Sequence, residues 1–385
     1  MSQTLQDILS PPTSQQAQPQ ALEAAAQAAI PQPVQVGWVA SADTLERLGR
    51  AINPLAVGLV DELVKLTAVV EEPAQLGDLP SPPVEVLTHR RPGFFGLFQD
   101  IPEDLIESLR RQKVQLLHAL EVSAWPMCRR LAGELNCPCL LTAWALGDAD
   151  RLGRLGPPAR GVVAVSEPIR RQLVDRRVMP ADRVHLVRPG MFQVRHASCF
   201  ADPQCSVSIV ISGSLDVPGP FETVLKSVWQ LQARQYDCVD FIIGNGRSQK
   251  RLRAMADKLN LRRQLTFVDR QPARQVAGIL KAADVYIMPA VEPDLPMEAL
   301  AAQAAGVPVV FNSADAADFL IDAQTALRFD PAKPDELTQL LVKLLSDRPW
   351  ARHLAEQALE HLRARHGVGA AVANMAQLYR RTVNS

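Results

Sequence analysis

Two glutamates lie on either side of a proline-broken loop whose residue types suit ligand binding. Glu292 and Glu298 flank this loop, which follows an apolar run beginning at Asp284 and precedes a helix-like run of small residues. Pro296 is a favourable first helical residue, so Glu298 is predicted to lie early in that helix. A carboxylate can accept several hydrogen bonds, and the acidic pair therefore suits a ligand site. The alternative is a solvated acidic loop.

A glycine-rich turn provides a second set of residues that could do chemistry. Gly244 and Gly246 follow an apolar run and precede a helical pattern, which favours a turn that faces a phosphate group. Arg247 and Lys250 lie beside the turn and could supply positive charge to a diphosphate, with Arg270 as a further option. The alternative is ordinary turn chemistry, because glycine permits positive φ in any loop.

Three further residues end predicted strands. Gly213 and Ser214 close the run V-S-I-V-I-S, where a small residue lets the backbone approach a phosphate and a serine can donate to it. His118 ends the run V-Q-L-L-H, and the carboxyl end of a parallel strand is where ligands meet a cleft. The alternatives are a plain strand end for Gly213 and Ser214, and a hydrogen-bonded structural group for the histidine.

The composition narrows the class of protein. The chain has 385 residues, equal numbers of basic and acidic side chains (41 each) and 47% hydrophobic residues, which is typical of a globular protein with two domains. A net charge of zero gives no support for nucleic acid binding and predicts at most peripheral contact with a membrane. No apolar run is long enough to span a bilayer. The first basic residue is Arg47, so no secretory signal is expected. The six cysteines are few and show no C-x-x-C spacing, which predicts reduced thiols in a cytoplasmic protein without a metal site.

Two series of short apolar runs alternate with helical patterns, which predicts two doubly wound α/β domains with parallel sheets. An irregular segment with proline and glycine separates the two series. The predicted divisions are a disordered Gln/Ala/Pro-rich tail at 1–33, an N-terminal Rossmann-like domain at 34–190, a linker at 191–205, a C-terminal Rossmann-like domain at 206–365 and a C-terminal helix at 366–385.

An ordered series of segments resembles the family 4 glycosyltransferases of the GT-B fold. The resemblance is carried by V-V-A-V-S-E-P-I-R-R-Q-L, I-S-G-S-L-D-V-P-G-P, F-I-I-G-N-G, A-A-D-V-Y-I-M-P and A-Q-A-A-G-V-P-V-V, in that order. It covers residues 160–381 and is weaker over 34–160. It implies two Rossmann-like domains that face a cleft, with the acceptor on the first and a nucleotide-sugar on the second, and a C-terminal helix that crosses back to the first domain.

The resemblance also implies an activity and roles for the residues above. The activity is retaining transfer of a hexose from a nucleotide-diphosphate sugar to an unknown acceptor, which is a glycan, a lipid or a small molecule. No metal and no further cofactor is required. The implied catalytic residues are His118 and Glu292. The implied nucleotide-sugar contacts are Gly213, Ser214, Gly244, Gly246, Arg247, Lys250 and Glu298.

The chain departs from the family pattern at four positions. The family has an arginine and a lysine where this chain has Ser214 and Gly219, and its second glutamate falls on Ala301. The first glutamate falls on Pro293, so Glu292 can replace it only with a slip of one residue. These differences motivate a second hypothesis, in which the chain is a catalytically degenerate homologue that acts as a binding or scaffold protein in glycan assembly.

Overall fold

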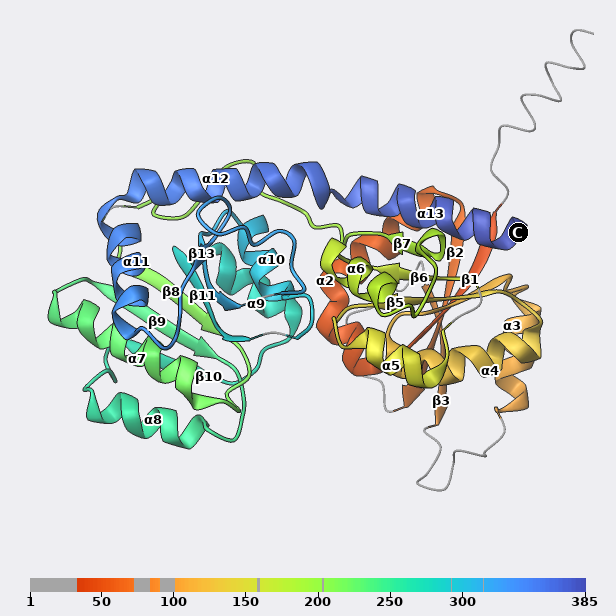
Figure 1. Cartoon of the computed structure of the whole chain (residues 1–385), viewed down its shortest axis with the longest axis horizontal. Helices are drawn as coiled ribbons and strands as arrows, with labels where there is room; N and C mark the ends of the chain where they lie inside the picture. The colour runs from red at the N-terminus through yellow and green to blue at the C-terminus, as the bar shows by residue number, and fades with distance from the viewer. Residues whose placement is uncertain are drawn as a thin grey trace, which may run out of the picture.

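The structure is a computed structural model that describes residues 33–72, 84–90, 101–157, 160–202, 204–291, 293–313 and 315–385. The described elements form two parallel sheets, one after the other along the chain, with helices on both faces (Figure 1). This confirms the two doubly wound α/β units predicted from the sequence. None of the helices in these ranges is long and apolar enough to cross a membrane.

The first sheet has the strand order β3-β2-β1-β4-β5-β6-β7. Its strands are β1 (Val34–Ala40), β2 (Val64–Glu72), β3 (Val84–Arg90), β4 (Leu116–Ala119), β5 (Cys139–Ala143), β6 (Gly161–Ala164) and β7 (Val184–Leu186). The helices between them are α2 (Ala42–Asp61), α3 (Glu103–Arg111), α4 (Trp125–Leu135), α5 (Asp148–Leu155) and α6 (Glu167–Asp175), with 3₁₀ turns at Val122–Ala124 and Ala181–Arg183.

The second sheet has the strand order β10-β9-β8-β11-β12-β13. Its strands are β8 (Val207–Ser212), β9 (Cys238–Ile243), β10 (Leu265–Val268), β11 (Val285–Val291), β12 (Val309–Ser313) and β13 (Leu327–Arg328). The helices are α7 (Pro218–Ala233), α8 (Gln249–Lys258), α9 (Ala273–Lys281) and α10 (Met297–Ala304). On β8, Ile209 and Ile211 pack into one apolar cluster and Val210 packs into another, so both faces of this central strand are covered.

In both sheets the strand order reverses beside the first strand. The first sheet reverses between β1 and β4, and the second reverses between β8 and β11. Loops that leave the carboxyl ends of two such strands diverge to opposite faces of the sheet, which opens a crevice for ligands. The two reversals therefore mark the edges at which a ligand site is expected.

Three C-terminal helices complete the chain: α11 (Pro334–Ser346), α12 (Arg348–Arg365) and α13 (Val368–Asn384). Helix α12 packs on α10 of the second sheet, whereas α13 packs on α2, β1 and β4 of the first sheet. Figure 1 shows α12 and α13 running along the same side of the molecule, from one sheet to the other. The chain thus crosses back to its first half, as the resemblance implied.

Candidate functional site

A cavity of about 450 Å³ lies at the carboxyl ends of the strands on either side of the reversal in the second sheet. We call it the switch-point cavity. Its described lining comes from the ends of β8 and β9, the loops after β8, β9 and β10, the helix α9, the strand β11, the start of α10 with the loop before it, and α2 of the first half. These residues are Arg47, Ser212, Gly213, Ser214, Asp216, Ile243, Gly244, Asn245, Arg270, Gln271, Val276, Tyr286, Met288, Asp294, Leu295, Pro296, Met297 and Glu298.

The structure brings part of the predicted set together in this cavity. Four of the predicted nucleotide-sugar contacts line it: Gly213, Ser214, Gly244 and Glu298. Glu298 is exposed in the first turn of α10, one helical turn before Ala301. The prediction for Glu292 falls outside the described residues.

Gly246 is not among the residues that line the cavity, but it packs against the turn at Leu215 and Asp216. A Cβ atom on Gly246 would lie 2.3 Å from the carbonyl carbon of Leu215 and 2.5 Å from the backbone nitrogen of Asp216. The two turns are also joined by hydrogen bonds from the Leu215 N–H to the Asn245 oxygen (3.0 Å) and from the Ser248 N–H to the Leu215 oxygen (3.0 Å). Glycine is needed here because backbone packs directly against backbone.

Replacing Gly246 with alanine should destabilise the protein by about 1–3 kcal/mol, because the two turns must separate to admit the methyl group. The free energy of unfolding in urea would measure the loss. A suitable control is Gly219→Ala, since nothing lies within 4 Å of a Cβ placed on Gly219. Equal stability of Gly246→Ala and the wild type would show that the turns can separate without cost.

The cations beside the glycine turn are directed differently from the prediction. The side chain of Arg247 is 90% exposed, and its Nε lies 3.4 Å from an oxygen of Asp216. Lys250 is exposed on α8 and, like Arg247, is not among the residues that line the cavity. Arg270 does line it, and its backbone N–H donates to the side-chain oxygen of Asn245 (3.2 Å).

A second arginine in the cavity was missed by the sequence analysis. Arg47 on α2 pairs with Asp294, with 3.0 Å between nitrogen and oxygen. The loop of Asp294 is also held by the first half, because the Leu295 N–H donates to the Trp144 oxygen (2.8 Å) and Asp294 forms an antiparallel bridge with Ala145. No local pattern in the sequence indicates a contact between residues this far apart.

The described lining of the cavity carries two arginines and three carboxylates. The carboxylates belong to Asp216, Asp294 and Glu298. The pKa of Asp216 is lowered, chiefly because its carboxylate accepts hydrogen bonds from the Arg247 backbone and the Ser214 hydroxyl. The cavity is therefore slightly acidic in formal charge, which suits hydroxyl groups better than a bare diphosphate.

His118 does not reach this cavity. It lies in β4 one residue before the strand ends at Ala119, and not at the predicted strand end. Its side chain is buried and both ring nitrogens contact protein groups. Nδ1 lies 2.7 Å from the Tyr379 hydroxyl and Nε2 lies 2.8 Å from the Thr142 hydroxyl. The Trp38 indole N–H also donates to the Tyr379 hydroxyl (2.9 Å). The residue thus joins β4 to α13, and direct contact with a ligand is not supported.

Burial sets the protonation state of this network. It lowers the pKa of His118 to about 3 and raises the pKa of Tyr379. The histidine is consequently neutral at physiological pH. A histidine in this state can position α13 but cannot donate a positive charge to a leaving group.

The second half of the chain is similar in sequence to known glycosyltransferases. Residues 209–361 match the family model described as "Glycosyl transferases group 1". A D-inositol 3-phosphate glycosyltransferase from Corynebacterium glutamicum is 27% identical over 33% of this chain and 30% of its own length. A GDP-mannose-dependent mannosyltransferase of monoacylated phosphatidylinositol monomannoside, from the same species, is 31% identical over 33% of this chain and 34% of its own length. The alignments thus span about a third of these relatives.

Solved structures support the fold over most of the chain. HepE from Anabaena, solved in complex with UDP, has a TM-score of 0.69 and 12% identity over 89% of this chain and 99% of its own. A sucrose-phosphate synthase from Thermosynechococcus elongatus has a TM-score of 0.70 and 18% identity over 90% of this chain and 98% of its own. At such low identities the likeness shows the fold alone, and it confirms the two Rossmann-like units.

Proposed function

We propose that this chain, which matches the family model of the group 1 glycosyltransferases over residues 209–361, transfers a sugar from a nucleotide-diphosphate sugar to an acceptor, with retention. The nucleotide-sugar lies in the switch-point cavity, and the acceptor approaches from the first half. The reaction needs no metal at the chemical step. UDP is a suitable first ligand to test, because the Anabaena protein of the same fold was solved with it.

The position of the cavity carries this proposal. It lies at the carboxyl ends of β8 to β11, where the strand order reverses, and the start of α10 opens into it. The residue before α10 is Pro296, which makes no side-chain hydrogen bond to the first turn. The N–H groups of that turn and the positive end of the helix dipole are therefore available to a phosphate oxygen.

The side chains around the cavity supply roles for transfer. Retaining transfer builds positive charge on the anomeric carbon and negative charge on the departing diphosphate, so cations near the diphosphate are the largest expected contribution. Arg270 reaches the cavity from the second half and Arg47 from the first. Glu298 provides a carboxylate for hydroxyl groups of the ribose or the sugar.

A specific observation favours a second candidate function, a degenerate homologue that binds or organises other components. The formal charge of the described lining is acidic, with Asp216, Asp294 and Glu298 against two arginines. Ser214 and Gly219 provide no cation where the family has two. A protein of this kind would retain the fold without transferring sugar.

Calorimetric titration with UDP, GDP and their sugars tests the proposal directly. The wild type should bind at least one of these nucleotides, and Arg270→Ala should weaken binding by about 1.5–3 kcal/mol, or roughly 10- to 150-fold, through loss of a charge-assisted hydrogen bond. Arg247→Ala is the matched control, because that side chain points to solvent. Absence of binding to every nucleotide at millimolar concentration excludes the proposed transfer.

A further inference from the structure

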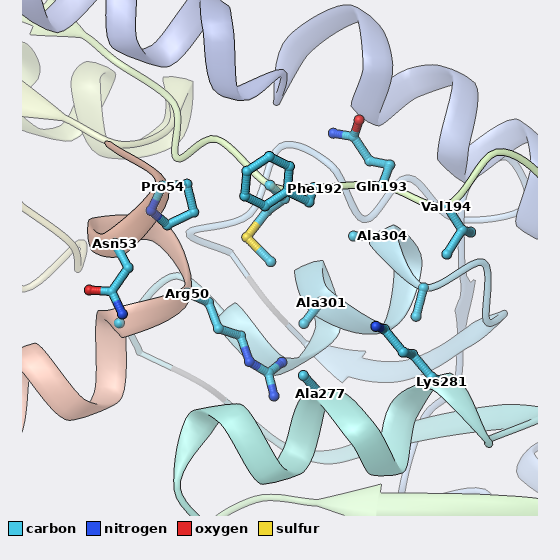
Figure 2. Close-up of a pocket in the computed structure, with 13 residues that line it drawn as sticks. Arg50, Asn53, Pro54, Phe192, Gln193, Val194, Ala277, Lys281, Ala301 and Ala304 are labelled. Carbon is cyan, nitrogen blue, oxygen red and sulfur yellow. The ribbon is translucent and has the colours of Figure 1, made fainter. Parts of the chain in front are cut away.

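A second cavity, of about 440 Å³, lies where the two halves meet the segment that joins them (Figure 2). We call it the linker cavity. Its walls come from α2, from residues 191–194, from α9 and from α10. The lining residues are Gly49, Arg50, Asn53, Pro54, Met191, Phe192, Gln193, Val194, Ala277, Lys281, Ala301, Ala304 and Ala305. Its volume is within the range of about 300–1,000 Å³ that small-molecule sites occupy.

Most of this lining is apolar. Ala301, Ala304 and Ala305 present only methyl groups from α10 and the turn after it, which leaves room above them. Phe192 lies on the opposite side and is 76% exposed, the largest exposed fraction among the big apolar side chains of the described residues. An exposed aromatic ring that faces a floor of small side chains offers two surfaces between which a hydrocarbon chain can lose contact with water.

Two cations enter the same space from opposite halves of the chain. Figure 2 shows the side chains of Arg50, from α2, and Lys281, from α9, directed toward the region between Ala277 and Ala301. The lining contains no carboxylate among its described residues. Within the described ranges Lys281 forms no ion pair. The cavity is therefore basic, in contrast to the switch-point cavity beside it.

Arg50 lines the linker cavity and also interacts electrostatically with residues of the switch-point cavity. Its pKa is lowered by burial, and the carboxylate of Glu298 and the hydroxyl of Tyr286 partly offset this effect. Glu298 and Tyr286 line the switch-point cavity, whereas Arg50 lines the linker cavity. A mostly buried guanidinium gains from an additional anion, because charge-assisted hydrogen bonds are strong where water is excluded.

We propose that the linker cavity binds an amphiphilic anion, with a hydrocarbon chain against Phe192 and the alanine floor and a phosphate or carboxylate facing Arg50 and Lys281. The apolar walls alone would accept any hydrocarbon. The two cations add a requirement for negative charge at one end of the ligand. The described lining of the linker cavity shares no residue with that of the switch-point cavity, where the proposed function places the nucleotide-sugar, and it includes Ala301, the position of the family's second glutamate.

Such a ligand would hold the two halves together. Arg50 belongs to α2 of the first half and Lys281 to α9 of the second, so one anionic group between them contacts both. A ligand that binds one arrangement of two domains better than another shifts the population toward that arrangement. The bound amphiphile therefore favours the arrangement in which α2 and α9 face each other.

Titration with decyl phosphate and decanoate, both kept below their aggregation concentrations, tests the proposal and distinguishes the two anionic groups. At least one of them should raise the melting temperature and bind in calorimetry. Decanol and inorganic phosphate should each bind at least tenfold more weakly, because decanol has the hydrocarbon chain without the charge and inorganic phosphate has the charge without the chain. UDP titrated separately reports on the other cavity.

Variants locate the binding. Lys281→Glu and Phe192→Ser should each weaken binding of the better amphiphile at least tenfold, and both residues are exposed or at a rim, so folding should be preserved. Lys258→Glu, at the exposed end of α8, is the matched control and should bind like the wild type. Unchanged binding in Lys281→Glu, or inorganic phosphate that binds as tightly as decyl phosphate, overturns the proposal.

Discussion

Lowering the pH from 6.5 to 4.5 should reduce the free energy of unfolding through two buried histidines, and His118→Gln should remove about half of their effect. Burial lowers the pKa of His118 to about 3 and that of His366 to about 4. In the unfolded chain both titrate near their ordinary pKa of about 6.5. Below that pH the unfolded state binds more protons than the folded state, so stability falls as the pH falls.

Asp240 acts in the opposite direction. Burial raises its pKa to about 7, against a single side-chain hydrogen bond from Gln264 (2.8 Å). The folded state therefore holds a proton on Asp240 that the unfolded state releases above a pH of about 4. The stability from this group is present at low pH and is lost as the pH rises toward 7, so it offsets one of the two histidines between pH 6.5 and 4.5.

The balance of these protons predicts three different pH profiles. Between pH 6.5 and 4.5 these groups should lower the free energy of unfolding of the wild type by about 2 kcal/mol. The loss should be about zero in His118→Gln and about 4 kcal/mol in Asp240→Asn. Urea unfolding at pH 6.5, 5.5 and 4.5 measures the three slopes. Parallel profiles for wild type and His118→Gln would falsify the assignment of His118 as a buried neutral residue.

The fold was predictable because its signal is repeated and local. Each central strand is a short apolar run, and the runs at Val207–Ser212 and Val239–Ile243 coincide with strands β8 and β9 to within one residue. Apolar runs without alternation require cover on both faces, which only a parallel sheet with flanking helices provides. A series of such runs therefore determines the architecture even where each run alone is ambiguous.

The site was predictable only where it depends on strand ends. Gly213 and Gly244 line the cavity because the carboxyl ends of adjacent parallel strands meet at one edge. His118 satisfies the same rule, yet Tyr379 covers it from α13, 261 residues further along the chain. Arg47 is a comparable case, since its partner Asp294 is 247 residues away. Contacts over such separations have no local signal in one sequence.

Side-chain direction was a further limit. Arg247 and Lys250 lie beside the glycine turn in sequence, but Arg247 extends into solvent and pairs with Asp216. Arg270 follows a neighbouring strand, β10, and its loop approaches the same turn through Asn245. A position next to a motif therefore predicts proximity of the backbone, whereas the tertiary arrangement decides which side chains line the cavity.

Restoring the family's charges should separate an active transferase from a degenerate homologue. Under the degenerate hypothesis, Ser214→Arg with Gly219→Lys should tighten nucleotide binding by at least about 2 kcal/mol, or roughly 30-fold, for the first charged contact to the diphosphate. The structure has room for both changes, because Ser214 is exposed at the cavity and nothing lies within 4 Å of a Cβ on Gly219. The matched control is Ser214→Gln with Gly219→Gln, which adds similar bulk without charge.

The third departure needs a separate variant, because Ala301 lines the linker cavity and not the switch-point cavity. A glutamate introduced by Ala301→Glu would lie in the same cavity as Arg50 and Lys281 and would neutralise part of their charge. We therefore expect Ala301→Glu to add little to nucleotide binding and to weaken binding of an amphiphilic anion.

Calorimetry with UDP and GDP measures the change in nucleotide binding, and calorimetry with decyl phosphate measures the change in binding of the amphiphilic anion. Sugar transfer by the wild type in a cell lysate would exclude the degenerate hypothesis, since Arg270, Arg47 and Glu298 would then suffice for the reaction.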